Sequence, residues 1–272
     1  MSQQLDLNEY KQQIADLYNR RSHHYDESEW HTRITHRLVE YAQINPGYHV
    51  LDIATGTGHV AIEVAAIVGS SGRVVGVDIS TGMLEQARQK VEALNISNIE
   101  FHLADAETLN FPANSFDRIL CAHAFPWMAD KEAALRLWYS FLKPGGLIGI
   151  HTPTYTTYIA DFVLQEVLEK NGVTIIASSK PTGTVEKCQN ILEKTGFEAI
   201  EIKTEEYEGN YINLEQAKQK CNASYYPALS QFSSEQLEQI KAEFDVQLEA
   251  LATEKGIWND GIALFAFGRK PV

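Results

Sequence analysis

The stretch that most constrains the fold is Val50 to Ala65, VLDIATGTGHVAIEVA, an apolar run that passes through two glycines into a helix-like pattern. Gly56 and Gly58 follow an acidic residue, Asp52, at the end of what reads as a buried strand. Glycine lets the backbone approach a ligand closely because it has no Cβ. The sequence therefore predicts a ligand at this loop, and the question is which one.

Apolar runs and helix-like patterns alternate on either side of this loop. Strands are expected at 50–54, 74–78, 99–105, 116–122 and 147–153, with helices between them at 60–68, 80–94 and 131–146. This alternation predicts an α/β protein with a mostly parallel, doubly wound sheet.

The pattern is less regular outside that region. Residues 5–41 read as helical, and after Pro153 we expect helices at 161–170, 185–194, 214–221 and 234–253, with strands at 197–209 and 261–271. We expect three parts: an N-terminal helical lid at 1–45, a core at 46–212 and 255–272, and a helical cap insert at 213–254.

Two ligands compete for the glycine loop. GTGHVA fits the dinucleotide fingerprint G-x-G-x-x-G/A, and Asp78 lies where a ribose-binding acid is expected. Asp52, four residues before Gly56, argues against a pyrophosphate, because a fixed carboxylate there would oppose it. The carboxylate suits a ligand with a cationic amine, or it braces the loop by accepting backbone N–H groups.

Five ordered motifs within Val50 to Thr152 carry a resemblance: LDIATGTG, VVGVDIS, LADAETL, FDRIL and LKPGG. They resemble those of the class I S-adenosylmethionine-dependent methyltransferases. With the N-terminal YNRRSHHYD, the chain is most similar to the ubiquinone/menaquinone-biosynthesis type and related small-molecule enzymes. The resemblance implies S-adenosylmethionine as cofactor and a Rossmann-like sheet of order 3-2-1-4-5-7-6 with an antiparallel last strand.

The resemblance also implies cofactor contacts. Asp78 would accept both ribose hydroxyls, Asp105 would accept from the adenine amine, and Asp52 would organise the loop. Alternatively, Asp78 caps the following helix and Asp105 is a turn residue. The implied cofactor-binding residues are Tyr25, Asp52, Ala54, Gly56, Gly58, Asp78, Ile79, Met83, Asp105 and Ala106.

Acceptor-binding residues are expected at the carboxyl ends of the fourth and fifth strands, where open α/β sheets bind ligands. His123, in CAHAFPWM, is the candidate catalytic residue, as a general base or simply as a wall of the site. Aromatic residues there stack on a flat acceptor or pack in the core. The candidate substrate-binding residues are Tyr18, His123, Phe125, Trp127, His151 and Tyr155.

Composition limits the partners. The net charge of −13 disfavours nucleic acid and anionic membranes. The three cysteines lack a C-x-x-C pair and the N-terminus lacks an apolar signal, so we expect a cytoplasmic protein without a metal site. We expect a small-molecule methyl acceptor and a monomer or homodimer. An NAD-dependent oxidoreductase and a non-catalytic cofactor-fold binder are the alternatives, although no Tyr-x-x-x-Lys stands in place for the former.

Overall fold

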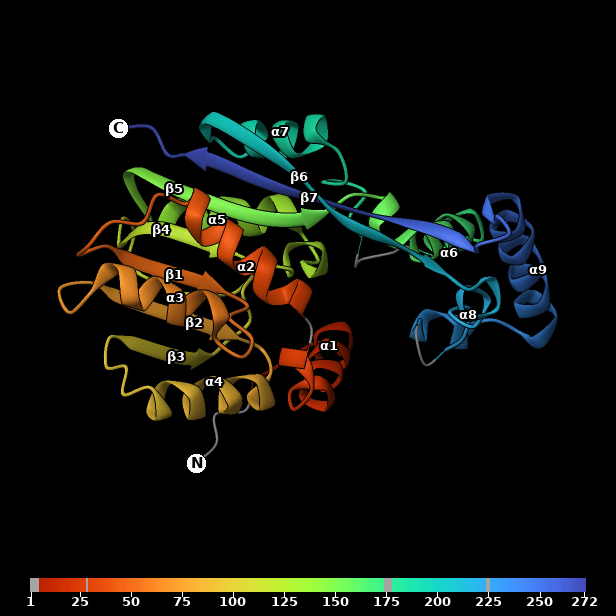
Figure 1. Cartoon of the computed structure of the whole chain (residues 1–272), viewed down its shortest axis with the longest axis horizontal. Helices are drawn as coiled ribbons and strands as arrows, with labels where there is room; N and C mark the ends of the chain where they lie inside the picture. Colours follow the sequence, from red (N-terminus) through yellow and green to blue (C-terminus); the bar gives the residue numbers. More distant parts are fainter. Residues whose placement is uncertain (1–4, 28, 174–177, 224–225) are drawn as a thin grey trace. The chain divides into compact units, whose positions relative to one another are not determined.

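The computed structural model describes residues 5–27, 29–173, 178–223 and 226–272. They form a seven-stranded sheet of order β3-β2-β1-β4-β5-β7-β6 (Figure 1). The strands are β1 (His49–Ile53), β2 (Arg73–Asp78), β3 (Ile99–Leu103), β4 (Phe116–Cys121), β5 (Leu142–Pro153), β6 (Glu198–Ile212) and β7 (Ile257–Arg269). Strands β1 to β5 pair in parallel, and the arrow of β7 in Figure 1 points the opposite way. The predicted strand order is confirmed.

Burial explains why the central strands are apolar throughout. Val50, Leu51 and Ile53 of β1 are fully buried, as expected for a parallel strand with helices on both faces of its sheet. Those helices include α3 (His59–Val68), α4 (Thr81–Ala93) and α5 (Lys131–Phe141). Ser80 caps α4 and Asp130 caps α5, each accepting from a first-turn N–H. These caps mark where α4 begins after β2 and where α5 begins after β4.

The N-terminal segment is not one continuous helix. It forms α1 (Glu9–Arg21), a 3-10 turn (Tyr25–Glu27) and α2 (Glu29–Tyr41). The break is held by Asp26, which accepts from Thr57 Oγ1 at 2.6 Å and contacts His59 Nε2 at 2.8 Å. These bonds attach the turn to the loop and helix after β1, and periodicity alone gives no sign of them.

Strands β6 and β7 are longer than expected. β6 continues to Ile212 and β7 begins at Ile257, not at 261. The early part of β7, IWND, has two apolar residues followed by two polar ones and so lacks an alternating pattern, yet its side chains alternate between buried and more exposed as in a strand with one covered face. Alternation over so few residues is a weak signal in the sequence.

The chain divides into two compact units. The first contains Met1–Thr152, Glu186–Lys203 and Phe265–Val272, and the second contains Pro153–Val185 and Thr204–Leu264. These limits differ from the three expected parts, because residues 1–45 pack with the core and residues 213–254 form one unit with residues from both sides of them.

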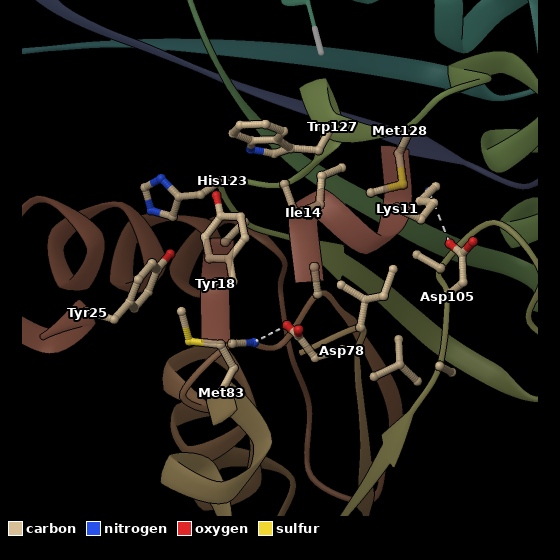
Figure 2. A pocket seen from close by; sticks show the side chains of 18 residues that line it. Lys11, Ile14, Tyr18, Tyr25, Asp78, Met83, Asp105, His123, Trp127 and Met128 are labelled. Carbon is tan, nitrogen blue, oxygen red and sulfur yellow. Dashed lines mark hydrogen bonds and ion pairs between the residues drawn. The ribbon is translucent and has the colours of Figure 1, made fainter. Parts of the chain in front are cut away.

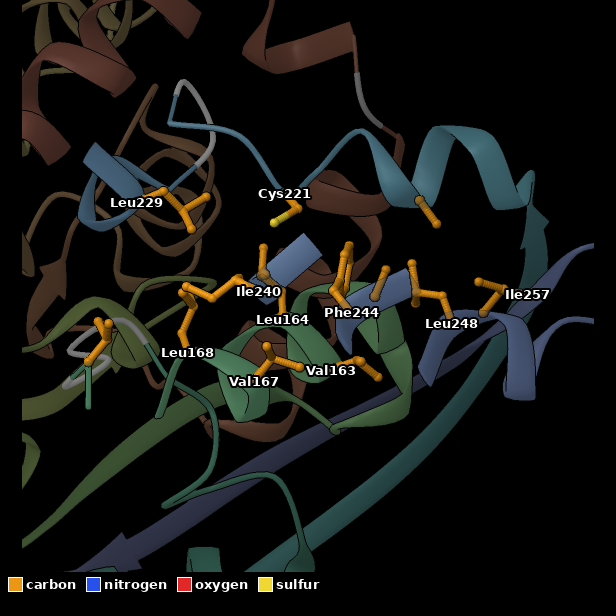
Figure 3. Close-up of a cluster of buried hydrophobic side chains, with 13 residues drawn as sticks. Val163, Leu164, Val167, Leu168, Cys221, Leu229, Ile240, Phe244, Leu248 and Ile257 are labelled. Atoms are coloured by element: carbon orange, nitrogen blue, oxygen red, sulfur yellow. The ribbon is translucent and has the colours of Figure 1, made fainter. Parts of the chain in front are cut away.

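The second unit has its own apolar core (Figure 3). Helix α6 (Ile159–Lys170) packs against α9 (Ser234–Leu251), and α8 (Leu214–Lys218) packs beside α9. Phe244 and Leu248 of α9 are fully buried there. A capping box of Ser233 and Gln236 begins α9.

The remaining helix, α7 (Val185–Lys194), precedes β6. Within the described ranges, no helix combines the length and apolar character needed to cross a membrane.

Candidate active site

The loop between β1 and α3 has an unusual backbone. Ala54, Gly56 and Gly58 have φ values of 53°, 56° and 88°, all in the left-handed region. A Cβ on Gly58 would lie 3.3 Å from Ala87 Cβ, whereas a Cβ on Gly56 would meet nothing nearer than Tyr25 Cε1 at 3.9 Å. Gly58 is therefore needed for packing against α4, and Gly56 faces open space.

Two buried carboxyls hold this loop. Asp78, at the end of β2, accepts from the backbone N–H of Gly56 and of Ser80, each at 2.8 Å. Asp52 is 1% exposed and accepts from the Thr55 hydroxyl. Burial raises the pKa of Asp52 to about 7 and that of Asp78 to about 6. Through these hydrogen bonds both residues stabilise the loop. The Asp78 carboxylate has lone pairs beyond those used by Gly56 and Ser80, and these can accept from a further donor.

A cavity opens beside the loop and encloses about 650 Å³ of space free of atoms, part of it open to solvent. Figure 2 shows Tyr25 and His123 at one end, Asp78 below the middle, and Lys11 with Asp105 at the opposite end. The lining residues are Lys11, Ile14, Tyr18, Tyr25, Ala54, Gly56, Val77, Asp78, Ile79, Met83, Ala104, Asp105, Ala106, Ala122, His123, Ala124, Trp127 and Met128.

Lys11 closes the Asp105 end of this cavity. Its Nζ lies 3.1 Å from Asp105 Oδ1 and also contacts Glu107, which accepts from the backbone N–H of Ala129 and Asp130. Sequence reasoning missed Lys11. A signal exists, because Lys11 shares a helical stripe with Ile14, Ala15 and Tyr18, so a charged residue stands on the buried face of α1.

The other end carries histidine and aromatic rings. The His31 ring stacks on that of Tyr25 at 4.2 Å, and it lies 4.9 Å from the ring of His123. The His123 ring lies 4.6 Å from that of His151, which is 2% exposed at the end of β5. Burial holds the pKa of His123 well below its usual range and lowers that of His151 to about 3. All of these imidazoles are therefore neutral at pH 7.

Most of the predicted cofactor residues line the cavity: Tyr25, Ala54, Gly56, Asp78, Ile79, Met83, Asp105 and Ala106. Asp52, near the end of β1, and Gly58, in the loop, do not line the cavity. Sequence reasoning did not name Lys11, Ile14, Val77, Ala104, Ala122, Ala124 and Met128.

The predicted acceptor residues are only partly brought together. Tyr18, His123 and Trp127 line the cavity. His151 lies against His123 but outside the lining, and Phe125 is fully buried against Trp138. Tyr155 belongs to the second unit, where its ring stacks on Phe162 and its hydroxyl donates to Lys180 O.

Comparisons with known proteins show the family of this chain. Residues 50–146 match a family model described as a methyltransferase domain. The chain is 35% identical over 148 residues to the aklanonic acid methyltransferase DauC of Streptomyces sp. (strain C5), a match that covers 54% of this chain and 67% of that one.

The chain belongs to the S-adenosylmethionine-dependent methyltransferases. This methyltransferase is also 40% identical over 117 residues to the ubiquinone/menaquinone biosynthesis C-methyltransferase UbiE of Pseudoalteromonas translucida (strain TAC 125), covering 41% of this chain and 47% of that one. The chain thus spans about half to two thirds of the relatives that it matches. Their names give no support to an NAD-dependent oxidoreductase.

Solved structures share the fold of this methyltransferase. Haemonchus contortus phosphoethanolamine N-methyltransferase 2, in complex with S-adenosylhomocysteine, aligns with a TM-score of 0.55 at 21% identity, covering 88% of this chain and 52% of that one. The [4+2]-cyclase SpnF aligns with a TM-score of 0.58 at 19% identity, covering 96% and 97%. A cyclase with this fold shows that the fold alone does not determine the reaction. The reaction must therefore be argued from the residues of the site.

Proposed function

We propose that the cavity binds S-adenosylmethionine along its length, with adenine at the Asp105 end and the methyl group toward His123. The order of the lining groups supports this orientation. Asp78, in the middle, is a carboxylate with unused acceptor capacity for two ribose hydroxyls, and Gly56 leaves room for a close approach of the ligand. Ile79 and Met83 supply apolar surface for the adenine ring.

The acceptor is a small, partly apolar molecule bound at the His123 end. Tyr18 and Trp127 line the cavity with their rings 6.0 Å apart, edge to face, which suits contact with a flat ring. When bound, S-adenosylmethionine supplies a methyl group already activated as a sulfonium. The protein's part is to position the acceptor and exclude water.

The N-terminal helix excludes that water. Asn19 of α1 accepts from Ser80 Oγ at 2.7 Å and from the backbone N–H of Gly82 at 2.9 Å, so α1 is bound to the start of α4. Lys11 attaches the other end of α1 to the loop after β3. We infer that residues 1–45 act as the lid of the site.

The setting and partners are also part of the proposal. The three cysteines, Cys121, Cys188 and Cys221, are free and buried, as suits a reducing cytoplasm. The net charge of −13 disfavours nucleic-acid substrates. We propose a monomer or homodimer.

Calorimetric titration with S-adenosylmethionine, S-adenosylhomocysteine and NAD tests the cofactor. We expect micromolar binding of both adenosyl ligands and none of NAD. Asp78→Ala should weaken adenosyl binding by about 1–3 kcal/mol, because two hydroxyl bonds to a charged group are lost. Binding of NAD alone, or an undiminished affinity in Asp78→Ala, would overturn the placement.

A further inference from the structure

Three ring nitrogens in one place lack hydrogen-bond partners. Among the described residues, the buried side-chain nitrogen or oxygen atoms without a partner are His123 Nε2, His151 Nδ1 and His151 Nε2. Buried polar groups are nearly always bonded, so an exception asks for an explanation. Here the three exceptions share a single contact between two rings, 4.6 Å apart at the acceptor end of the cavity.

The backbone at His123 is strained, and the rings around the histidine pair come from several elements. His123 has φ 59°, a left-handed conformation that a residue with a Cβ rarely adopts. Its ring lies against those of His31 from α2 and His151 from β5, and the His151 ring in turn lies 5.5 Å from that of Phe265 in β7. Strained backbone and unpaired polar atoms therefore coincide at a wall of the cavity, which His123 lines, although the unpaired nitrogens themselves are buried.

The charges around the pair limit what it can bind. The titratable groups that face His123 are His151, His31 and, further away, His59, each of which disfavours a second positive charge there. His31 in turn faces Arg21, His59 and Asp26. Neutral imidazoles do not offset the buried charge of a carboxylate, and a cationic amine has no carboxylate partner among these rings. An uncharged hydroxyl that can both donate and accept fits them.

We propose that His123 and His151 form a neutral imidazole pair that selects an acceptor with an un-ionised acidic hydroxyl, a phenol or an enol. This rests on the proposed methyl transfer at the same site. His123 takes the hydroxyl proton, and His151 is a positioning residue that accepts a hydrogen bond from the resulting imidazolium.

The step balances in atoms and charge. The acceptor oxygen forms a bond to the methyl carbon with its lone pair, the carbon–sulfur bond breaks with its electron pair going to sulfur, and the hydroxyl proton moves to His123. The products are a methyl ether, a neutral thioether and an imidazolium. The site holds one positive charge before and after the step, on sulfur first and on His123 afterwards. The imidazolium then returns its proton to solvent.

Three naphthalene probes test the selectivity: 1-naphthol, 1-naphthoate and 1-naphthylmethylamine, which are neutral, anionic and cationic at pH 7. Their affinities are measured by calorimetry on the full chain loaded with S-adenosylhomocysteine. The wild type should bind 1-naphthol at least tenfold more tightly than the other two. His151→Phe should lose most of that preference, whereas His151→Gln, which keeps a donor and an acceptor, should retain it within about threefold.

Phe265→Leu is the matched control, because it disturbs the packing around His151 without removing an imidazole. It should change all three affinities by the same factor. Equal binding of the probes, a preference for 1-naphthoate or 1-naphthylmethylamine, no binding of any probe, or an unchanged preference in His151→Phe would overturn the proposal. Failure of S-adenosylhomocysteine itself to bind would instead overturn the proposed function.

Discussion

Lys11 Nζ lies 3.1 Å from Asp105 Oδ1, and this contact joins the first helix of the chain to the loop after β3. The side chains of Lys11, Asp105 and Glu107 are 7%, 12% and 13% exposed, so the group is shielded from solvent. Lys11 is the shared cation of this cluster, so its removal leaves two shielded carboxylates without their ion pair, whereas removal of either acid leaves Lys11 paired with the other. The contact therefore couples the position of α1, the proposed lid, to the Asp105 end of the cavity, where we propose that adenine binds.

Lys11→Met keeps most of the side-chain volume and removes the charge. We expect it to lower the free energy of unfolding by about 2–3 kcal/mol, because two poorly exposed carboxylates lose their cation. Denaturant unfolding measures the change. Affinity for S-adenosylhomocysteine should also fall, because α1 no longer holds the adenine end closed.

Lys143→Met is the control for this variant. Lys143 pairs with Asp117 and is 40% exposed, so its loss should change the free energy of unfolding by less than about 1 kcal/mol. If the two variants were equally stable, the Lys11 contacts would contribute no more than an ordinary surface pair.

The two glycines of the loop should separate binding from stability. Both have positive φ, so alanine costs about 1–2 kcal/mol at either position. Gly58→Ala should cost more, because its Cβ would crowd Ala87, but adenosyl affinity should change little since Gly58 does not line the cavity. Gly56→Ala should cost less stability and reduce that affinity at least tenfold. Calorimetry and denaturant unfolding on both variants test this. If Gly58→Ala lost affinity while Gly56→Ala lost mainly stability, Gly58 and not Gly56 would be the glycine that the ligand approaches.

The sequence predicted those parts of the fold and site that depend on residues close together in the chain. The strands at 50–54 and 74–78 were identified to within one residue, because a parallel strand covered on both faces is a continuous apolar run. The family resemblance that the motifs carry implied the strand order, and eight of the ten predicted cofactor residues line one cavity. All of them except Tyr25 lie within a few residues of the carboxyl end of β1, β2 or β3, where the fold itself determines position.

Contacts between distant segments could not be predicted in this way. Lys11 is 94 residues from Asp105, and the buried face of a helix does not say which loop it meets. The adjacency of His31, His123 and His151 needs three elements to be placed together. The turn at Tyr25–Glu27 depends on bonds from Asp26 to residues 31 and 33 positions away.

Asp52 should make stability depend on pH in an unusual direction. Its pKa rises from 3.8 in the unfolded chain to about 7 in the fold, so the folded state holds an extra proton between about pH 4 and pH 7. Stability from this group is therefore lost as pH rises through that window. The free energy of unfolding of the wild type minus that of Asp52→Asn should fall by about 1.4 kcal/mol per pH unit there. Denaturant unfolding at four pH values measures this, and a flat difference would mean that Asp52 titrates alike in both states.

His151→Phe should stabilise the protein while harming acceptor binding. Phenylalanine is close to histidine in shape and removes two buried polar atoms without partners, for a gain of about 1–3 kcal/mol at pH 7. The pKa of His151 falls from 6.5 in the unfolded chain to about 3 in the fold, so below pH 6.5 the unfolded state binds the extra proton. Wild-type stability from this group is present above that pH and is lost as pH falls.

The free energy of unfolding of His151→Phe minus that of the wild type should therefore increase by about 2 kcal/mol between pH 7 and pH 5. Thermal and denaturant unfolding at both pH values measure it, with His36→Phe on the exposed side of α2 as a control for the loss of a surface histidine. A variant less stable than the wild type at both pH values would mean that the ring nitrogens of His151 have partners in the folded protein. Their lack of partners would then no longer be a sign of function.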